Sequence, residues 1–352
     1  MPVFNFLTPS ADPRTALQLP RLLPQLLPGA ALSCVIAMAA TLVSTLHGGP
    51  QFLYALFFGV AFHYLSHDAK TLPGIEFCSR SVLRLGVGLL GARITAGQIV
   101  GLGWSTAAIV IVAVVTTLLS GVFLGRRLGM NRAEGVLSGG AVAICGASAA
   151  LAISAVLPRT KESERFTLMV VVTVTVLSTL AMVIYPLVAR LLHLPPELAG
   201  LFLGGTIHDV AQVVGAGYML SPETGDYATI VKLFRVAMLA VVVVVVSSVF
   251  KRQREASVRT SDGSEKKLAL VPWFLWLFVA LVFVNSEGFV PAAVQNGLND
   301  ISRACLVVAI SALGVKTSFR QLARAGWRPF VLLLVETLWM AGFVLAAILV
   351  RR

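Results

Sequence analysis

This chain of 352 residues contains few charged residues. Asp, Glu, Lys and Arg make up 12% of it, whereas hydrophobic residues make up 57%. A soluble domain carries about 25% charged residues, so this composition argues against a water-soluble fold. Apolar runs of membrane-spanning length recur from about residue 30 to the C-terminus, and none shows the alternation of a transmembrane barrel. The sequence therefore predicts an all-α polytopic membrane protein.

Cysteine and catalytic motifs are also scarce. The four cysteines, Cys34, Cys78, Cys145 and Cys305, stand singly within or beside apolar segments and form no C-x-x-C or metal-binding spacing. This pattern argues against a disulfide framework, and we expect neither a metal site nor a cofactor. H-E-x-x-H, paired-Asp and G-x-S-x-G motifs do not occur. An intramembrane enzyme is therefore the least favoured class of function.

Acidic residues are fewer than basic ones, 16 against 28, which gives a net charge of +12. Such a charge can attract nucleic acid, but basic residues of membrane proteins collect in cytoplasmic loops. We therefore expect the lipid bilayer, and no nucleic acid, as a partner. Residues 1–29 contain no compact signal peptide with a cleavage site and are expected to form a cytoplasmic lead. Residues 30–352 are expected to form a single transmembrane transporter domain, with a cytoplasmic loop at 251–267.

Runs of about twenty apolar residues predict about eleven transmembrane helices. They lie near 30–48, 51–67, 79–97, 103–125, 135–157, 166–192, 198–219, 229–250, 269–290, 299–316 and 328–350. The basic loops favour a cytoplasmic N-terminus and an external C-terminus. The basic segment at 159–165 fits this orientation poorly. It would return to the cytoplasmic side if the helices near 139 and 204 were both re-entrant, so that alternative stays open.

Two stretches, Gly139–Leu157 and Gly204–Gly217, each open with a Gly-Gly pair inside apolar sequence. Each glycine costs a helix interior about 1 kcal/mol relative to alanine. Unwound backbone is tolerated in a membrane only where protein or a water-filled cavity satisfies its polar groups. We therefore predict two interrupted helices whose breaks approach each other in the core of the bundle. The alternative is a pair of continuous helices whose small residues allow close packing.

The chain also contains an internal repeat. Gly74–Trp104 can be laid over Gly297–Trp327 without a gap, and the matches include a Ser-Arg pair, a Gln and a Gly-Trp pair. Six predicted spans lie between the copies, so the copies are expected to point in opposite directions. Inverted repeats with broken helices are typical of secondary transporters. Arg93 and Lys316 follow matching Leu-Gly pairs, and are either basic gates that attract anions or side chains that snorkel to the membrane surface.

The motifs GGAVAICGASAALA and GGTIHDVAQVVGAGY, with the turn LGVKTSFRQL, resemble the YeiH-type family of sulfate exporters. The resemblance covers nearly all of residues 30–352. It implies an inner-membrane protein of the cation/proton antiporter and anion transporter group, with inverted repeats and two crossing discontinuous helices. It also implies a small anion as the substrate. A homodimer stays open.

The candidate site residues come from the two Gly-Gly stretches. Expected substrate contacts are Gly139, Gly140, Ile144, Cys145, Gly146, Ala147, Ser148, Gly204, Gly205, Thr206 and Gln212. His208 and Asp209 lie near mid-membrane, where ionisable residues suggest function, and we expect them to couple protons. Alternatively, Asp209 only caps the half-helix that follows. Lys232 and Arg235 are expected to snorkel at the start of a span. Arg84 and Glu336 lie deeper, and either is a candidate for a buried ion pair, although the sequence assigns no partner.

These observations predict a secondary transporter that exports a small anion, sulfate or a related sulfur oxyanion, with proton coupling as an option. A free half-helix N-terminus offers backbone N–H groups and a positive dipole to an anion. The alternative is a cation/proton antiporter of the same fold. Such antiporters usually place several carboxylates at the break, and Asp209 is the only one there.

Overall fold

The computed structural model describes residues 19–47, 50–158, 161–251, 273–317 and 327–351, and these residues form helices joined by turns, with no strand. Large apolar side chains are exposed along many helices; Trp104 and Val350, for example, are 91% and 90% exposed. Helices satisfy their own backbone groups, which is what a lipid environment requires. The structure thus confirms the prediction of an all-α polytopic membrane protein.

The chain divides into two compact units, each assembled from segments that are distant in sequence. Unit 1 comprises Met1–Gly101 and Val271–Thr317, and unit 2 comprises Leu102–Leu270 and Ser318–Arg352. The expected single domain of residues 30–352 therefore consists of two bodies, which are described separately below. Helix α2 begins at Leu19, within the expected N-terminal lead. Nearly all of the expected cytoplasmic loop at 251–267 lies outside the described residues.

Unit 1 holds the two copies of the repeat, apart from residues 102–104 of the first copy and 318–327 of the second. Its elements are α2 (Leu19–His47), α3 (Gln51–Ala61), η2 (His63–His67), α4 (Leu72–Phe77), η3 (Cys78–Val82), α5 (Leu83–Leu89), η4 (Leu90–Ala92), α6 (Ala96–Gly101), α15 (Trp273–Ser286) and α16 (Ala292–Lys316). The segment from α4 to η4 is a single rod with one π-helical turn, η3, in its middle. Residues 74–92 of the first copy therefore form a helical segment with a π-helical turn, whereas residues 297–316 of the second belong to the continuous α-helix α16.

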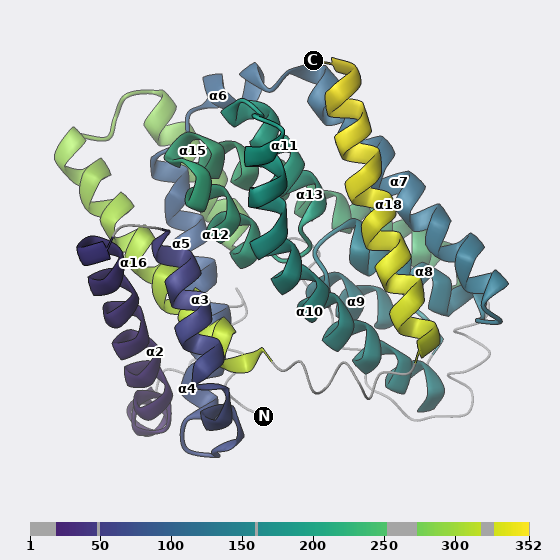
Figure 1. Cartoon of the computed structure of the whole chain (residues 1–352), viewed down its shortest axis with the longest axis horizontal. Helices are drawn as coiled ribbons and strands as arrows, with labels where there is room; N and C mark the ends of the chain where they lie inside the picture. The colour runs from purple at the N-terminus through teal and green to yellow at the C-terminus, as the bar shows by residue number, and fades with distance from the viewer. Residues whose placement is uncertain (1–18, 48–49, 159–160, 252–272, 318–326, 352) are drawn as a thin grey trace. The chain divides into compact units, whose positions relative to one another are not determined.

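The two repeat copies cross in opposite directions within unit 1. The Gln295 amide near the start of α16 donates to the carbonyl of Ala92, the last residue of η4, at 3.0 Å. Further along α16, the Ser302 hydroxyl donates to the Gly86 carbonyl at 2.6 Å. The other ends of both copies share a buried cluster of Ile75, Cys78, Ala312 and Val315. Figure 1 shows the same antiparallel course for α5 and α16. Superposition of the two copies by a two-fold rotation stays a prediction.

Gly91 and Gly314, which occupy the same position in the two copies, each pack closely against the backbone of a neighbouring helix. A Cβ on Gly314 of α16 would stand 2.4 Å from the Leu56 carbonyl oxygen of α3. A Cβ on Gly91 of η4 would stand 2.3 Å from the Phe278 carbonyl oxygen of α15. Each copy thus packs its Leu-Gly pair against the helix that precedes the other copy.

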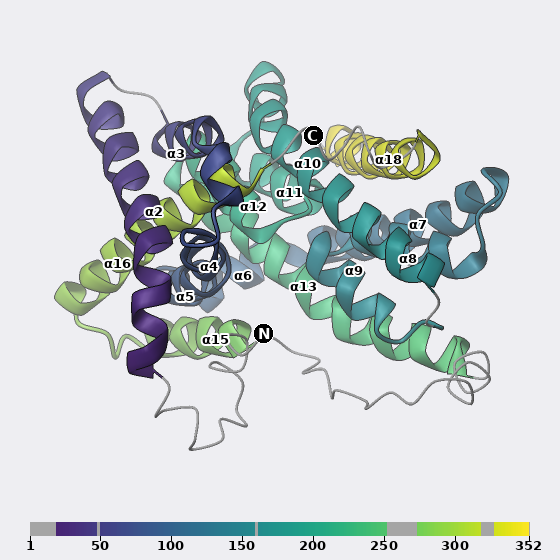
Figure 2. The same cartoon turned by 90° about the horizontal axis from the view of Figure 1, so that it is seen from below.

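Unit 2 contains the two predicted broken helices. Its elements are α7 (Gly103–Arg127), α8 (Arg132–Ala143), α9 (Ala147–Ser154), α10 (Lys161–Leu191), α11 (Pro196–Thr206), α12 (Val210–Leu220), α13 (Pro222–Val249) and α18 (Trp327–Arg351). Asn131 and Glu134 form a capping box at the start of α8, as their spacing predicts. Helices α7 and α8 lie side by side in both views (Figures 1 and 2). Glycines allow this approach: a Cβ on Gly121 would lie 2.6 Å from the Gly135 carbonyl oxygen.

Six helices are long and apolar enough to cross a membrane, counted over the described residues. They are α2 from Pro24, α7, α10 from Glu162, α13, α16 and α18. The other predicted spans correspond to shorter apolar helices, such as α3 and α15, or to rods assembled from two or more helices. The chain is therefore a multi-pass membrane protein, and the expected number of about eleven crossings stays a prediction.

Candidate functional site: two helix breaks around buried cations

The first predicted break is present, but it does not lie at the Gly-Gly pair. Helix α8 continues to Ala143, the backbone turns at Ile144 (φ −117°, ψ −85°), and α9 begins at Ala147. Gly146 makes the turn possible, since its φ of +62° and ψ of −123° would strain any residue with a side chain. The prediction of an interrupted helix is confirmed, and the break lies within the predicted stretch, after the Gly-Gly pair.

The Gly-Gly pairs have a packing role instead. Gly139 lies in α8, and a Cβ there would stand 2.9 Å from the Leu118 carbonyl oxygen of α7. Gly204 lies in α11, and a Cβ there would stand 2.4 Å from the Ala228 carbonyl oxygen of α13. At these residues the alternative reading, close packing of small residues, is the correct one. The helices remain regular because the neighbouring helices stabilise them enough to offset the intrinsic cost of glycine.

The second break spans Ile207 to Asp209, between α11 and α12. The Asp209 carboxylate accepts a hydrogen bond from the backbone N–H of Ala211 at 2.8 Å, which confirms the predicted N-cap. The backbone N–H groups of His208 and Asp209 both donate to the Ser178 hydroxyl of α10, at 3.2 and 3.0 Å. The unwound segment is therefore held by its own cap and by one hydroxyl of a neighbouring helix.

The two breaks meet inside unit 2. A Cβ on Gly146 of the first break would lie 3.3 Å from the Cβ of His208 in the second. The Nδ1 atom of the His208 ring lies 3.1 Å from the Val142 carbonyl oxygen at the end of α8. A side chain of the second break thus bonds to the end of the helix before the first, which confirms the prediction that the breaks approach each other.

Lys232 of α13 bridges the two breaks. Its ammonium donates to the Ile144 carbonyl at 2.6 Å and to the Ile207 carbonyl at 2.9 Å, and its side chain is fully buried. The prediction that Lys232 and Arg235 snorkel to the membrane surface is therefore wrong. Both side chains point into the core because the carbonyls that the breaks leave without intrahelical partners need donors.

Arg235 holds the same two helix ends. Its guanidinium donates to the carbonyls of Val142 and Ala143 at the end of α8, at 2.8–3.1 Å. It also donates to those of Gly204 and Ile207 at the end of α11, at 2.9 and 3.1 Å. The planar guanidinium suits this role because it offers five N–H donors in a fixed geometry. Arg235 and Lys232 together place two cations beside the negative ends of two half-helix dipoles.

His208 connects this centre to α18. Its Nε2 atom lies 3.0 Å from the Thr337 hydroxyl, which itself lies 2.7 Å from the Leu333 carbonyl oxygen. Since the Val142 carbonyl only accepts, Nδ1 carries a proton. A neutral His208 therefore accepts from Thr337 at Nε2, whereas a protonated His208 donates there and leaves the Thr337 proton to Leu333. The arrangement accommodates both charge states without moving a heavy atom.

Most of the other predicted contact residues lie close to the breaks. The Ser148 hydroxyl lies 2.9 Å from the Cys145 sulfur, and both residues belong to the first break or to the turn that follows it. The Gln212 amide in the first turn of α12 donates to the Thr179 hydroxyl at 2.8 Å, and its Oε1 has no partner among the described residues. Thr206 ends α11 and bonds back to Phe202.

Two predicted residues belong to the other unit. Lys316 ends α16, and its ammonium lies 3.9 Å from a carboxylate oxygen of Glu76. Arg93 follows η4 at the end of the first repeat copy. Both therefore lie at the ends of the repeat helices of unit 1, and their expected role as basic gates stays a prediction. Arg84 lies in α5 of the same unit.

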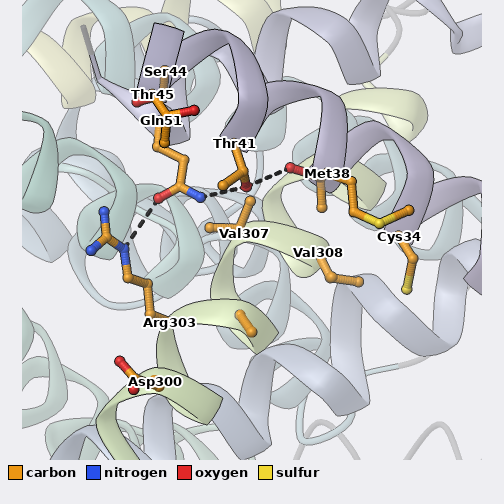
Figure 3. Close-up of a pocket in the computed structure, with 12 residues that line it drawn as sticks. Cys34, Met38, Thr41, Ser44, Thr45, Gln51, Asp300, Arg303, Val307 and Val308 are labelled. Atoms are coloured by element: carbon orange, nitrogen blue, oxygen red, sulfur yellow. Dashed lines mark hydrogen bonds between the residues drawn. The ribbon is translucent and has the colours of Figure 1, made fainter. Parts of the chain in front are cut away.

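Unit 1 has a groove of its own, about 600 Å³ in volume, between α2 and α16. Figure 3 shows its polar end, where the Gln51 side chain donates to the Thr41 hydroxyl at 2.7 Å and accepts from Arg303 Nε at 3.1 Å. Its other end is lined by apolar side chains such as Met38 and Val308. None of the predicted substrate-binding residues lines this groove.

Sequence reasoning missed the donors and acceptors that other helices bring to the breaks. Lys232 and Arg235 are three residues apart on one helix, a spacing that places both on one face, and this was the available signal. Ser178, Thr337 and Glu336 stand in apolar helices without a motif around them. Only the packing of α10 and α18 against the breaks shows what they contact.

Comparison with known proteins identifies a family of membrane proteins. The family model described as conserved hypothetical protein 698 matches residues 28–333. A membrane protein of Chlorobaculum tepidum is 48% identical over 322 residues, which cover 91% of this chain and 88% of that protein. Membrane protein TauZ of Paracoccus pantotrophus is 46% identical over 328 residues, which cover 93% of this chain and 96% of that protein.

The chain therefore belongs to the conserved hypothetical protein 698 family, the YeiH-type family that its motifs indicate. A further relative, a membrane protein of Rhizobium meliloti, is 46% identical over 321 residues and covers 91% of both chains. No solved structure matches this chain.

Proposed function

We propose that this protein is a secondary transporter that exports a small anion, sulfate or a related sulfur oxyanion, across the cell inner membrane. One observation carries the proposal: two fully buried cations stand where two broken helices meet. Ionisable groups inside a membrane protein are costly and are found where ions or protons pass. Midplane sites at broken helices are typical of secondary transporters.

The charges around the crossing sum to a positive value. With both side chains protonated, Lys232 and Arg235 contribute about +2, and an ionised Asp209 contributes about −1. The carbonyl ends of α8 and α11 carry about −0.5 each, and the N–H ends of α9 and α12 about +0.5 each. The dipole contributions cancel, so about one positive charge remains. A centre of this kind favours an anion over a cation.

The first break also offers backbone donors. Helix α9 starts at Ala147 without a side-chain cap, in contrast to α12, which Asp209 caps. Uncapped N–H groups at a helix N-terminus bind oxyanions because donors and dipole point the same way. The Ser148 hydroxyl lies in the same first turn. We propose that the anion binds at this end of α9, beside Lys232.

A cation/proton antiporter is less well supported. Transporters of this architecture coordinate cations with unwound carbonyls and half-helix C-terminal ends. Here the carbonyls of Ile144 and Ile207 accept from the Lys232 ammonium, and those of Ala143 and Gly204 accept from Arg235. The oxygens that would hold a metal cation are thus engaged by the protein's own cations.

Export needs little driving force beyond the membrane potential. One charge moved through 100 mV is worth about 2.3 kcal/mol, so a dianion leaving an inside-negative cell gains about 4.6 kcal/mol. At 1.4 kcal/mol per tenfold, this sustains a gradient of about three decades. His208 and Asp209 then have one of two roles. Either they only shape the site, or they carry one proton with the dianion, in which case one net charge moves, the gain falls to about 2.3 kcal/mol and export also depends on pH.

The test is flux in proteoliposomes that contain the purified protein and a radiolabelled substrate: the anions sulfate, sulfite and thiosulfate, or the zwitterion taurine. We expect saturable efflux of at least one of them, driven by an inside-negative potential, with the substrate recovered unchanged. Lys232→Met should abolish the efflux, whereas Arg126→Gln, which removes an exposed cation at the end of α7, should not.

The opposite result would be no flux of any anion, combined with sodium or potassium flux that follows a pH gradient. That result would favour the cation/proton antiporter. A chemically altered anion would instead point to catalysis.

A further inference from the structure

Glu336 is a buried acid that the proposed anion site does not use. It lies in the middle of α18, and its side chain is fully buried. One carboxyl oxygen, Oε1, lies 2.8 Å from the Ser138 hydroxyl of α8. The other, Oε2, has no hydrogen-bond partner among the described residues. This arrangement is poor for a carboxylate, which offers about four acceptor sites.

The hydrogen-bond count around Ser138 favours a neutral acid. The Ser138 hydroxyl has one proton, and its oxygen also lies 3.2 Å from the Gly135 carbonyl oxygen, which can only accept. If Glu336 carries a proton on Oε1, it donates to Ser138, and Ser138 donates to Gly135. If Glu336 is ionised, the shared proton of Ser138 is its one hydrogen bond among the described residues. Burial of a carboxylate with so few hydrogen bonds is unfavourable.

The backbone of α7 leaves room for this acid. A Cβ on Gly121 would stand 2.7 Å from Glu336 Oε1. The carboxyl group therefore occupies space that any side chain at this position of α7 would fill. Glycine at this position leaves space for one buried carboxyl group between α7, α8 and α18.

The acid lies next to the helix crossing. Thr337, the following residue of α18, bonds to His208 of the second break. Met340, one turn further along, lies with its sulfur 3.5 Å from Arg235. On α8, Ser138 is one turn before Val142, which accepts from Arg235 and contacts the His208 ring. One face of α18 thus contacts the acid's partner, the second break and a buried cation.

We propose that Glu336 is the site at which this transporter binds the proton that travels with its anion. This inference rests on the proposed anion transport and assigns the proton to a group beyond His208 and Asp209. Protonation adds one positive charge beside the crossing and strengthens anion binding, so anion and proton bind together. On release, the O–H bond of Glu336 breaks, the proton passes to water, and the carboxylate keeps the electron pair.

The other charged groups on the helices packed against α18 stand near the ends of those helices. They are Arg126 and Arg127 of α7, Arg132 and Glu134 of α8, Glu162, Glu164, Arg165 and Arg190 of α10, and Glu197 of α11. Arg235 of α13, one turn from Lys232, contacts α18 through Met340, and His208 contacts it through Thr337. Since His208 is the other group beside Glu336 that titrates near neutral pH, the test must separate Glu336 from His208.

The first measurement is the infrared spectrum of the purified protein near neutral pH, which does not depend on transport. We expect the carbonyl stretch of a protonated carboxylic acid in the wild type and in His208→Gln, and its loss in Glu336→Gln. Glu164→Gln, an exposed glutamate of α10, is the matched control and should keep the band. A wild type without the band, or Glu336→Gln with it, would overturn the proposal.

The second measurement is the steady-state anion gradient in proteoliposomes at several pH differences. One coupled proton changes this gradient about tenfold per pH unit in the wild type. Glu336→Gln should still move anion under voltage but lose this pH dependence. Loss of the dependence in His208→Gln, with retention in Glu336→Gln, would assign the proton to His208 instead.

Two outcomes separate this inference from the proposed function. If no anion moves in the wild type but the infrared band behaves as expected, anion transport fails and the proton site stands. If Glu336→Gln does not fold, Ser138→Ala keeps the acid and removes its partner. It should then shift the pH at which the band disappears, and an unchanged midpoint would contradict the proposal.

Discussion

The two helix breaks of unit 2 are bound by the same two cations, but the half-helices that follow them, α9 and α12, begin differently. Lys232 and Arg235 bond to the carbonyl ends of both α8 and α11. After the first break, Gly146 turns the chain with a positive φ, and α9 starts without a side-chain cap. After the second break, Asp209 caps α12 with its carboxylate. The capped break is stabilised internally, whereas the uncapped break keeps its donors for a ligand.

This difference separates the groups that stabilise the breaks from the groups that are free to bind a ligand. The carbonyl ends must be satisfied in every state, because buried carbonyls without donors are expensive in a membrane. The N–H groups at the start of a half-helix can bind a substrate anion, provided that no side-chain carboxylate already neutralises the positive end of that helix dipole. The four predictions that follow test this division, from the largest expected effect to the smallest.

Removing the shared cation should damage both breaks at once. Arg235→Met takes away the donors to four backbone carbonyls, and we expect it to lower stability by about 3–5 kcal/mol, as for a broken buried charge network. Thermal unfolding of the purified protein in detergent measures this. Arg126→Gln, at an exposed position, should unfold like the wild type. An unchanged melting temperature for Arg235→Met would show that the breaks do not need the guanidinium.

Straining the turn at the uncapped break should have the next largest effect. Gly146→Ala forces a side chain into a backbone conformation at φ +62° and ψ −123°, and the new Cβ would crowd His208. Strain of this kind costs about 1–3 kcal/mol. Gly342→Ala in α18 is the control, since a Cβ there meets no atom within 4 Å. It should be stabilising by up to about 1 kcal/mol. Equal melting temperatures for the two variants would contradict the role of Gly146.

Removing the cap of the second break should cost less. Asp209→Ala leaves the Ala211 N–H without its acceptor and should destabilise by about 0.5–2 kcal/mol, whereas Asp209→Asn retains a capping oxygen and should cost a few tenths. Flux and internal pH, followed together in proteoliposomes, show whether Asp209 also handles a proton. If Asp209→Asn keeps the wild-type rate and pH dependence, Asp209 is a cap and no more.

The smallest expected effect concerns the hydroxyl that holds the second break open. Ser178→Ala removes the acceptor for two backbone N–H groups, those of His208 and Asp209. We expect a loss of about 1 kcal/mol, the net contribution of a typical hydrogen bond to stability. Hydrogen exchange at residues 208 and 209 should quicken, while exchange in α9 should not change.

Much of the fold could be predicted from the sequence. Apolar runs predicted the helices. The glycine-rich stretches predicted both interrupted helices, because glycine within an apolar stretch disfavours a continuous helix. The exact positions could not be predicted. Gly139 and Gly204 pack against α7 and α13, a contact that only the tertiary structure shows. Lys232 was read as a snorkelling residue because nothing in its own segment indicates that carbonyls from two distant helices converge on it.

The same limit applies to the site. His208 and Asp209 stood out as charges within an apolar run, and Asp209 was predicted correctly as a cap. Thr337 and Ser138 could not be predicted, since a lone hydroxyl in an apolar helix usually bonds to its own backbone. Sequence therefore predicted the residues that define the breaks and missed those that other helices supply to them.

Equilibrium binding of radiolabelled anions to the purified protein tests the central claim most directly. The account predicts saturable binding of sulfate, sulfite or thiosulfate to the wild type and to Arg126→Gln. It predicts binding to Lys232→Met that is weaker by about tenfold or more, or roughly 1.4 kcal/mol. Binding of equal strength to Lys232→Met, in a variant that keeps its fold by gel filtration, would show that the buried cations do not form the anion site.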